Sequence, residues 1–184
     1  FLIFILLVGI TAARQTVASL KKVRRAEELE QFALNDSMTG MYNRNAYDYF
    51  VKNEKDFEGY VIVTFDLNNL KQCNDQYGHR AGDEYIINAA HIIEDNFERY
   101  GKCYRIGGDE FCCIIPKGRY FKIERVMHKI DQDVEILNHK NIIPVPVGIA
   151  YGYAVFTADD TDPEKVRERA DEDMYRNKKT MKQF

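Results

Sequence analysis

The chain has little of several features that would identify common classes of protein. Among its 184 residues there is no tryptophan, no internal repeat and no low-complexity tract, and the formal net charge is only −3. A general nucleic-acid-binding domain usually carries a strongly basic face, so this charge balance argues against nucleic acid as a partner. With 45% hydrophobic and 30% charged residues, the chain can form one globular domain with a sizeable core.

The cysteines are few, and they do not have the spacing of a metal site. They are Cys73, Cys103, Cys112 and Cys113. Cys112 and Cys113 are consecutive in a predicted strand and therefore point to opposite faces of a sheet. We expect all four to be reduced and mostly buried, as in a cytosolic domain.

The amino-terminal residues differ from the rest of the chain. Phe1 to Ala13 carries no charge and is mostly large and apolar, but it is shorter than the ~20 residues that a membrane helix needs. We expect residues 1–13 to be the carboxyl-terminal end of a transmembrane helix. Basic residues follow at positions 14, 21, 22, 24 and 25, which predicts a cytoplasmic domain attached to the inner or plasma membrane.

Residues 14–35 are predicted to link this segment to the domain formed by residues 36–184. Small or apolar residues lie near heptad spacing at Leu20, Val23, Ala26, Leu29 and Ala33. This pattern favours a parallel signalling coiled coil. A solvated, charged helix is the alternative.

The stretch Arg105–Phe111 predicts an acidic turn at the tip of a β-hairpin. Gly107 and Gly108 separate two apolar runs, so they mark a tight turn. Asp109 and Glu110 follow directly and project away from the sheet, where they can hold a divalent cation or accept a proton. An ordinary polar turn is the alternative.

A second acidic position ends the first strong strand. Asp66 follows an apolar run and precedes a predicted helix whose free N–H groups, around Asn68 to Leu70, can bind anionic oxygens. Asp66 supplies hard oxygen ligands and Lys71 adds a positive charge. Alternatively, Asp66 or Asn68 is only a helix cap.

Two further segments carry local patterns. Asp36 and Ser37 can cap a helix that begins near Thr39, with Gly40 permitting a bend. Lys178 and Lys182 lie four residues apart on one face of the last helix. The alternative interpretation is that they are ordinary solvated residues of a helix end.

Together these stretches resemble the GGDEF domains, the diguanylate cyclases that condense two GTP molecules into cyclic di-GMP. The matching segments are 36–44, 66–83, 105–111 and 170–182, in the family's order and spacing. The family usually has aspartate and phenylalanine where this chain has Asn68 and Leu70. The resemblance implies an α+β fold, the ferredoxin-like palm, with a mostly antiparallel sheet flanked by helices.

The resemblance also implies roles for individual residues. Asp66, Asp109, Glu110 and the backbone carbonyl of Leu67 would hold two Mg²⁺ or Mn²⁺ ions, and Asp109 would also accept a proton. Asn74 and Asp83 match the residues that bind the guanine base, whose donor edge suits a carboxylate. The remaining substrate contacts would come from Leu70, Lys71, Gly107, Gly108, Lys178 and Lys182.

The implied reaction is two-metal phosphoryl transfer between two GTP molecules held by the two subunits of a homodimer. A catalytically silent module that binds GTP or cyclic di-GMP and signals by contact is one alternative. A purely structural dimerisation domain is another.

Many family members carry an inhibitory cyclic di-GMP site built on an Arg-x-x-Asp pattern ahead of the acidic turn. Here the corresponding positions are Glu98 and Gly101, and Arg99 is one place out of register. We therefore expect no high-affinity product inhibition through this site.

The predicted order of elements follows from the hydrophobic pattern. It is a helix over 43–51, a strand over 60–66, a short helix over 68–76, a long helix over 81–99, a hairpin over 103–115, a helix over 120–137, a strand over 145–156, and a last helix that begins at Asp162-Pro163.

Overall fold

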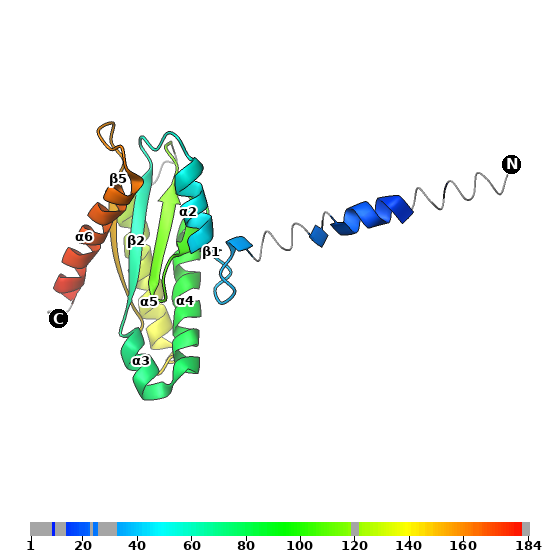
Figure 1. Cartoon of the computed structure of the whole chain (residues 1–184). Coiled ribbons are helices and arrows are strands. Elements are labelled where there is room, and N and C mark those ends of the chain that lie inside the picture. Colours follow the sequence, from blue (N-terminus) through cyan, green and yellow to red (C-terminus); the bar gives the residue numbers. More distant parts are fainter. Residues whose placement is uncertain (1–8, 10–13, 23, 26–32, 119–121, 182–184) are drawn as a thin grey trace.

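A five-stranded sheet forms the centre of the computed structural model of this protein (Figure 1). The structure describes residues 9, 14–22, 24–25, 33–118 and 122–181. The strands are β1 (Tyr42–Asn43), β2 (Val61–Asn68), β3 (Lys102–Arg105), β4 (Glu110–Ile115) and β5 (Gly148–Val155). The helices are α2 (Arg44–Asn53), α3 (Leu70–Tyr77), α4 (His79–Phe97), α5 (Ile123–His139) and α6 (Pro163–Met181).

The sheet has the order β1-β3-β4-β2-β5, and only β1 runs parallel to its neighbour. Because successive strand residues point to opposite faces, each face carries its own core. Val63 and Phe65 pack with α4 and α5, whereas Ile62 packs with α2 and α6. This arrangement confirms the predicted α+β class.

The cysteines follow the same alternation. Cys112 belongs to the core under α2 and α6, and Cys113 to the core under α4 and α5. All four cysteines are free and buried, as expected.

The helix predicted to begin near Thr39 is wrong. The Asp36 side chain instead accepts hydrogen bonds from the backbone N–H and the hydroxyl of Thr39, at 2.9 and 2.8 Å, and so closes a turn. Gly40 takes a left-handed φ of 79°, which confirms the bend. The helix begins only at Arg44, where the Asn43 side chain accepts from the N–H of Ala46 at 3.0 Å.

Strand β2 extends two residues beyond the predicted end and includes Asn68. The cap of α3 is Asn69, in a left-handed conformation with φ 62°, and its side chain makes no capping bond. The alternative in which Asp66 or Asn68 merely caps this helix is therefore wrong.

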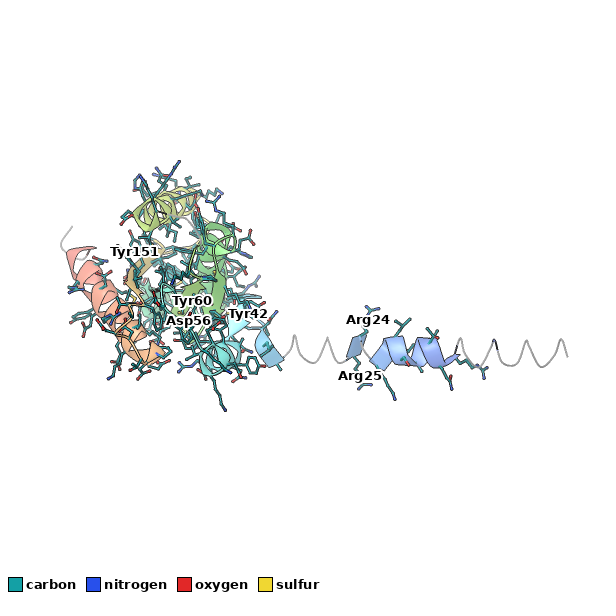
Figure 2. All side chains as sticks on the ribbon, turned by 90° about the horizontal axis from the view of Figure 1, so that it is seen from above. Arg24, Arg25, Tyr42, Asp56, Tyr60 and Tyr151 are labelled. Atoms are coloured by element: carbon teal, nitrogen blue, oxygen red, sulfur yellow. The ribbon has the colours of Figure 1, made fainter. Side chains whose placement is uncertain are left out.

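Ahead of the domain, residues 14–22 and 24–25 have helical backbone. Arg24 and Arg25 belong to this helical segment, drawn in blue in Figure 2. Its apolar side chains Val17 and Leu20 are exposed. Except for Gly9, the segment Phe1–Ala13 lies outside the described residues, as do Val23, Ala26 and Leu29 of the predicted heptad. Among the helices that the structure describes, none is long and apolar enough to cross a membrane.

Candidate active site

The acidic turn lies where the sequence predicts it, but Glu110 does not project away from the sheet as expected, because it is the first residue of β4. Strands β3 and β4 form a hairpin, and the N–H groups of Ile106 and Gly107 donate to the Glu110 carbonyl at 3.0 and 3.2 Å. A Cβ atom at Gly107 would lie only 2.8 Å from a Glu110 carboxylate oxygen. A Cβ at Gly108 would meet no atom within 4 Å, so contacts within the described chain do not explain this second glycine. Close approach by a substrate would require it.

The turn adjoins the end of β2. Asp66 is the register partner of Glu110, so both side chains leave the same face of the sheet. The N–H of Leu67 donates to the Asp109 carbonyl at 3.0 Å. The structure thus brings together the four residues that the sequence analysis assigned to a metal. We call this place, where the end of β2 meets the acidic turn, the acidic edge.

A cation from the far end of the chain completes this edge. The Lys178 ammonium on α6 forms an ion pair with Asp66 Oδ1, although the two residues are 112 positions apart. Both side chains are about three-quarters buried, with 25% and 22% exposed. Lys182, the second predicted lysine, lies outside the described residues.

The carboxylates at this end of the sheet supply only part of the ligands of a divalent ion. Within residues 33–118 and 122–181, no group of three or more histidine, cysteine, aspartate or glutamate side chains is placed to hold a metal. Magnesium is commonly bound by one or two carboxylates together with phosphate oxygens of the substrate. The carboxylates here therefore fit a metal that arrives with a nucleotide, whose phosphate oxygens would complete its ligands.

The beginning of α3 faces the same end of the sheet. Since Asn69 makes no capping bond, the N–H groups of the first turn have no side-chain acceptor from their cap. Leu70 is buried in the core, so only its backbone could contact a substrate, whereas Lys71 is exposed. The Asn68 Oδ1 atom is buried and has no hydrogen-bond partner in the described chain.

The predicted guanine-binding residues also come together. Asn74 on α3 lies against Gly82 on α4, where a Cβ atom would be 2.0 Å from Asn74 Oδ1. Asp83 follows Gly82 and is exposed. Glycine at 82 therefore makes room for the Asn74 amide, one residue before Asp83.

Arg105 has a role that the sequence analysis missed. Its guanidinium donates to Asp36 Oδ1 at 3.0 Å and to the Gly108 carbonyl at 2.8 Å, and so joins the first turn of the domain to the acidic turn. Burial opposes the charge on Asp36, but hydrogen bonds from Thr39 and Arg105 outweigh it and lower the pKa of that carboxyl. The only hint in the sequence was an arginine placed two residues before the glycine pair.

Tyr85 on α4 was missed as well. Its hydroxyl donates to the Asn68 carbonyl at 2.5 Å and accepts from the N–H of Gly148 at 2.7 Å. It thereby ties the end of β2 to the start of β5. Burial raises the pKa of Tyr85 to about 12, so the hydroxyl stays protonated as a donor. A tyrosine in an apolar helix pattern gives no sign of this contact.

Comparisons with known proteins agree with this geometry. The profile described as "Diguanylate cyclase, GGDEF domain" matches residues 33–183. A bifunctional diguanylate cyclase/cyclic di-GMP phosphodiesterase from Pseudomonas aeruginosa, MucR, is 30% identical over 175 residues, which are 90% of this chain and 25% of MucR. The diguanylate cyclase DgcS of Shewanella oneidensis is 28% identical over 158 residues, covering 83% of this chain and 52% of DgcS. The chain thus spans about half or less of the length of these relatives.

Among solved structures, the coiled coil and GGDEF domain of DgcB from Caulobacter crescentus, in complex with c-di-GMP, superposes with a TM-score of 0.74. The identity is 23%, and the match covers 92% of this chain and 94% of that one. At this identity the likeness concerns the fold.

The fold and the acidic edge define a cyclase-like α+β domain. The family match covers most of the chain, so the protein belongs to the GGDEF domain family of diguanylate cyclases.

Proposed function

We propose that this protein is an active diguanylate cyclase, a nucleotidyltransferase that condenses two GTP molecules into cyclic di-GMP and two pyrophosphates. The observation that carries the proposal is the edge where Asp66 pairs in register with Glu110 of the acidic turn and also binds the Lys178 ammonium. Two acidic strand ends and a cation, beside an uncapped helix start, suit a metal-bound triphosphate.

Two Mg²⁺ or Mn²⁺ ions would be held by Asp66, Asp109, Glu110 and the Leu67 carbonyl. Such ions, when bound, lower the pKa of the attacking hydroxyl and neutralise charge on the leaving pyrophosphate. The residues present fit this role, with the triphosphate supplying the ligands that the protein lacks.

The reaction forms and breaks one bond at each of two phosphorus atoms. Each GTP 3′-oxygen bonds to the α-phosphorus of the other GTP, and the bond to the β-phosphate oxygen breaks, so pyrophosphate leaves. Asp109 accepts the proton of the hydroxyl. Lys71, Lys178 and Lys182 hold the phosphates, and Asn74 with Asp83 orients the guanine.

One subunit cannot complete the ring, so the proposal includes a homodimer. Its support is the exposed apolar pair Val17 and Leu20 ahead of the domain, at spacing suited to a helix partner. We also propose that residues 1–13 anchor the chain to the inner or plasma membrane with the catalytic domain in the cytoplasm. The basic residues at 14–25 support this orientation.

A silent module that signals by contact is the second candidate. A similar segment occurs in a relative named for phosphodiesterase rather than cyclase activity: PdeR of Escherichia coli is 30% identical over 156 residues, which are 24% of PdeR. The described chain also lacks a complete metal cage of its own. The chain nevertheless keeps Asp66 and both acids of the turn, which favours activity.

The deciding experiment is to incubate the dimeric protein with GTP and Mg²⁺ and to separate the products by chromatography with mass detection. Cyclic di-GMP and pyrophosphate in a 1:2 ratio are expected, and chelation of the metal should stop both. Nucleotide binding without product would support the silent module instead.

A further inference from the structure

Asp66 is already occupied by a cation before any metal arrives. The Lys178 ammonium contacts Oδ1 of Asp66, the carboxylate that the proposed function assigns to a metal. A carboxylate that keeps a close ammonium contact binds a divalent ion less strongly, because the two positive charges repel each other. Lys178 therefore competes with a metal for Asp66.

The position of Lys178 is set by a clasp between α6 and the sheet. Strand β5 lies at the edge of the described sheet, next to β2. On its outer edge, the Tyr153 N–H donates to Asp173 Oδ2 at 3.2 Å, and the Tyr151 carbonyl accepts from Asn177 Nδ2 at 3.1 Å. Asp173 and Asn177 are four residues apart and so share one face of α6.

The contact between helix and strand is unusually close at the centre of this clasp. A Cβ atom at Gly152 would lie 2.1 Å from the Met174 nitrogen and 2.4 Å from the Ala170 carbonyl oxygen. The Tyr151 side chain turns the other way, toward α5, where its hydroxyl donates to Asp131 at 3.0 Å (Figure 2). The backbones of α6 and β5 are therefore in direct contact here, and the side chains of Asp173 and Asn177 fix the position of the helix along the strand.

Asn177 immediately precedes Lys178, so the clasp ends one residue before the lysine that reaches Asp66. We propose that Lys178 is a resident counter-ion that holds the Asp66 carboxylate until a metal-bound nucleotide displaces it, and that Asp173 and Asn177 are the positioning residues that keep it there. On displacement the ammonium moves to the incoming triphosphate and so keeps an anionic partner. The inference rests on the proposed function in taking Asp66 as a metal ligand and a triphosphate as the group that receives Lys178.

The test compares metal and nucleotide binding, which should change in opposite directions. Binding of Mn²⁺ to the nucleotide-free full chain is measured by electron paramagnetic resonance, and binding of GTP by calorimetry with Ca²⁺ present to prevent turnover. Lys178→Met should strengthen Mn²⁺ binding roughly five-fold, as expected for loss of a partly exposed ion pair, and should weaken GTP binding. Asn177→Ala should cause both changes to a smaller extent.

Three further variants separate positioning from a general loss of structure. Asp173→Asn keeps an oxygen acceptor for the Tyr153 N–H and should behave more like the wild type than Asp173→Ala does. Adding Asn177→Ala to Lys178→Met should change Mn²⁺ affinity no further, because the clasp acts through the lysine. Lys165→Met removes an exposed charge from the same helix and should leave Mn²⁺ affinity unchanged.

The outcomes that overturn the inference are distinct from failure of the proposed function. The inference is wrong if Lys178→Met binds Mn²⁺ no better than the wild type, or if Asn177→Ala weakens the binding of both Mn²⁺ and GTP. Either result would count against it even if the wild type makes cyclic di-GMP. If the opposite changes appear but the wild type makes no product, the inference stands and the cyclase proposal fails.

Discussion

Two carboxylates decide whether the proposed chemistry can occur. Asp66→Asn and Asp109→Asn each remove an anionic ligand while preserving size, so each should lower the rate of cyclic di-GMP formation on the order of a hundred-fold or more. The thermal midpoint should change little, because neither side chain belongs to a core. Product is measured by chromatography and folding by circular dichroism.

Asp95→Asn provides the matched control, because Asp95 is exposed on α4 away from the acidic turn. It should keep the wild-type rate. Near-normal turnover by the Asp66 or Asp109 variant in Mg²⁺ would refute the metal assignment.

Selection of the base depends on the neighbouring pair Asn74 and Asp83. A site built to hydrogen-bond one base rejects another by leaving its polar groups unpaired, so GTP should be preferred to ATP by about 10⁴-fold in kcat/KM. Gly82→Ala should weaken GTP binding, because the new Cβ would lie 2.0 Å from Asn74 Oδ1. Competition assays with both nucleotides measure the preference. Comparable turnover of ATP, or unchanged GTP affinity in Asp83→Ala, would contradict this assignment.

Which of these residues the sequence could reveal depended on how local their signals are. The acidic turn is local, because two glycines between apolar runs predict it directly. The ion pair of Lys178 with Asp66 joins residues 112 positions apart and depends on the packing of α6, so no pattern near either residue indicates it. The family resemblance alone brought Lys178 into the site, and it gave no reason to expect Asp66 as its partner.

The helices and strands were predictable where hydrophobic residues recur at regular spacing and where turn or cap residues mark the ends. Strand β2 follows from its β-branched run, and α6 begins as predicted, with Asp162 accepting the N–H of Glu164 at 3.0 Å. Two errors fall at single polar residues whose local conformation the hydrophobic pattern does not determine. Asp36 closes a turn on Thr39 instead of capping a helix, and Asn69 adopts a left-handed conformation that lets β2 continue to Asn68.

The link between the first turn and the acidic turn predicts a pH dependence. The pKa of Asp36 is lowered in the folded state, so its charge stabilises the fold above the unfolded pKa of ~3.9, and this contribution is lost as the pH falls through the folded value. Asp36→Asn should therefore lower the free energy of unfolding by about 1 to 2 kcal/mol at pH 7. The deficit should shrink below pH 4, where the wild-type carboxyl becomes protonated.

Urea unfolding at pH 7 and pH 3 measures both values, and Asp159→Asn, at an exposed position, serves as the control. A deficit of the same size at both pH values would show that Asp36 acts through its shape rather than its charge. Arg105→Ala should be at least as destabilising at pH 7, because it also frees the Gly108 carbonyl of the acidic turn.

At the scale of the whole molecule, the residues at 98 and 101 decide whether product can inhibit through the family's site. The family's inhibitory pattern would need an arginine at 98 and an aspartate at 101. Glu98 follows the end of α4, and a Cβ at Gly101 would lie 2.1 Å from the Ile114 carbonyl oxygen, so this backbone cannot carry aspartate there. Arg99 lies beside the Tyr100 ring, 4.7 Å from its centroid. We propose that the geometry of the dimer proposed above controls activity instead.

We therefore predict no inhibition by micromolar cyclic di-GMP through an Arg-x-x-Asp site. A cleft of about 830 Å³ beside Arg99 does carry further cations, Lys122, Arg125 and Lys129, which attract anions, and its described lining includes no carboxylate to accept from guanine. Any binding there should be weak and should fall steeply between about 50 and 300 mM salt. Over this range the Debye length falls from roughly 14 Å to roughly 6 Å, so the charges are screened more strongly. A turnover assay with added cyclic di-GMP, alongside calorimetry on nucleotide-free protein at both salt concentrations, measures this. Micromolar inhibition that persists in high salt and disappears in Arg99→Ala would show that Arg99 does form an inhibitory site despite its shifted register.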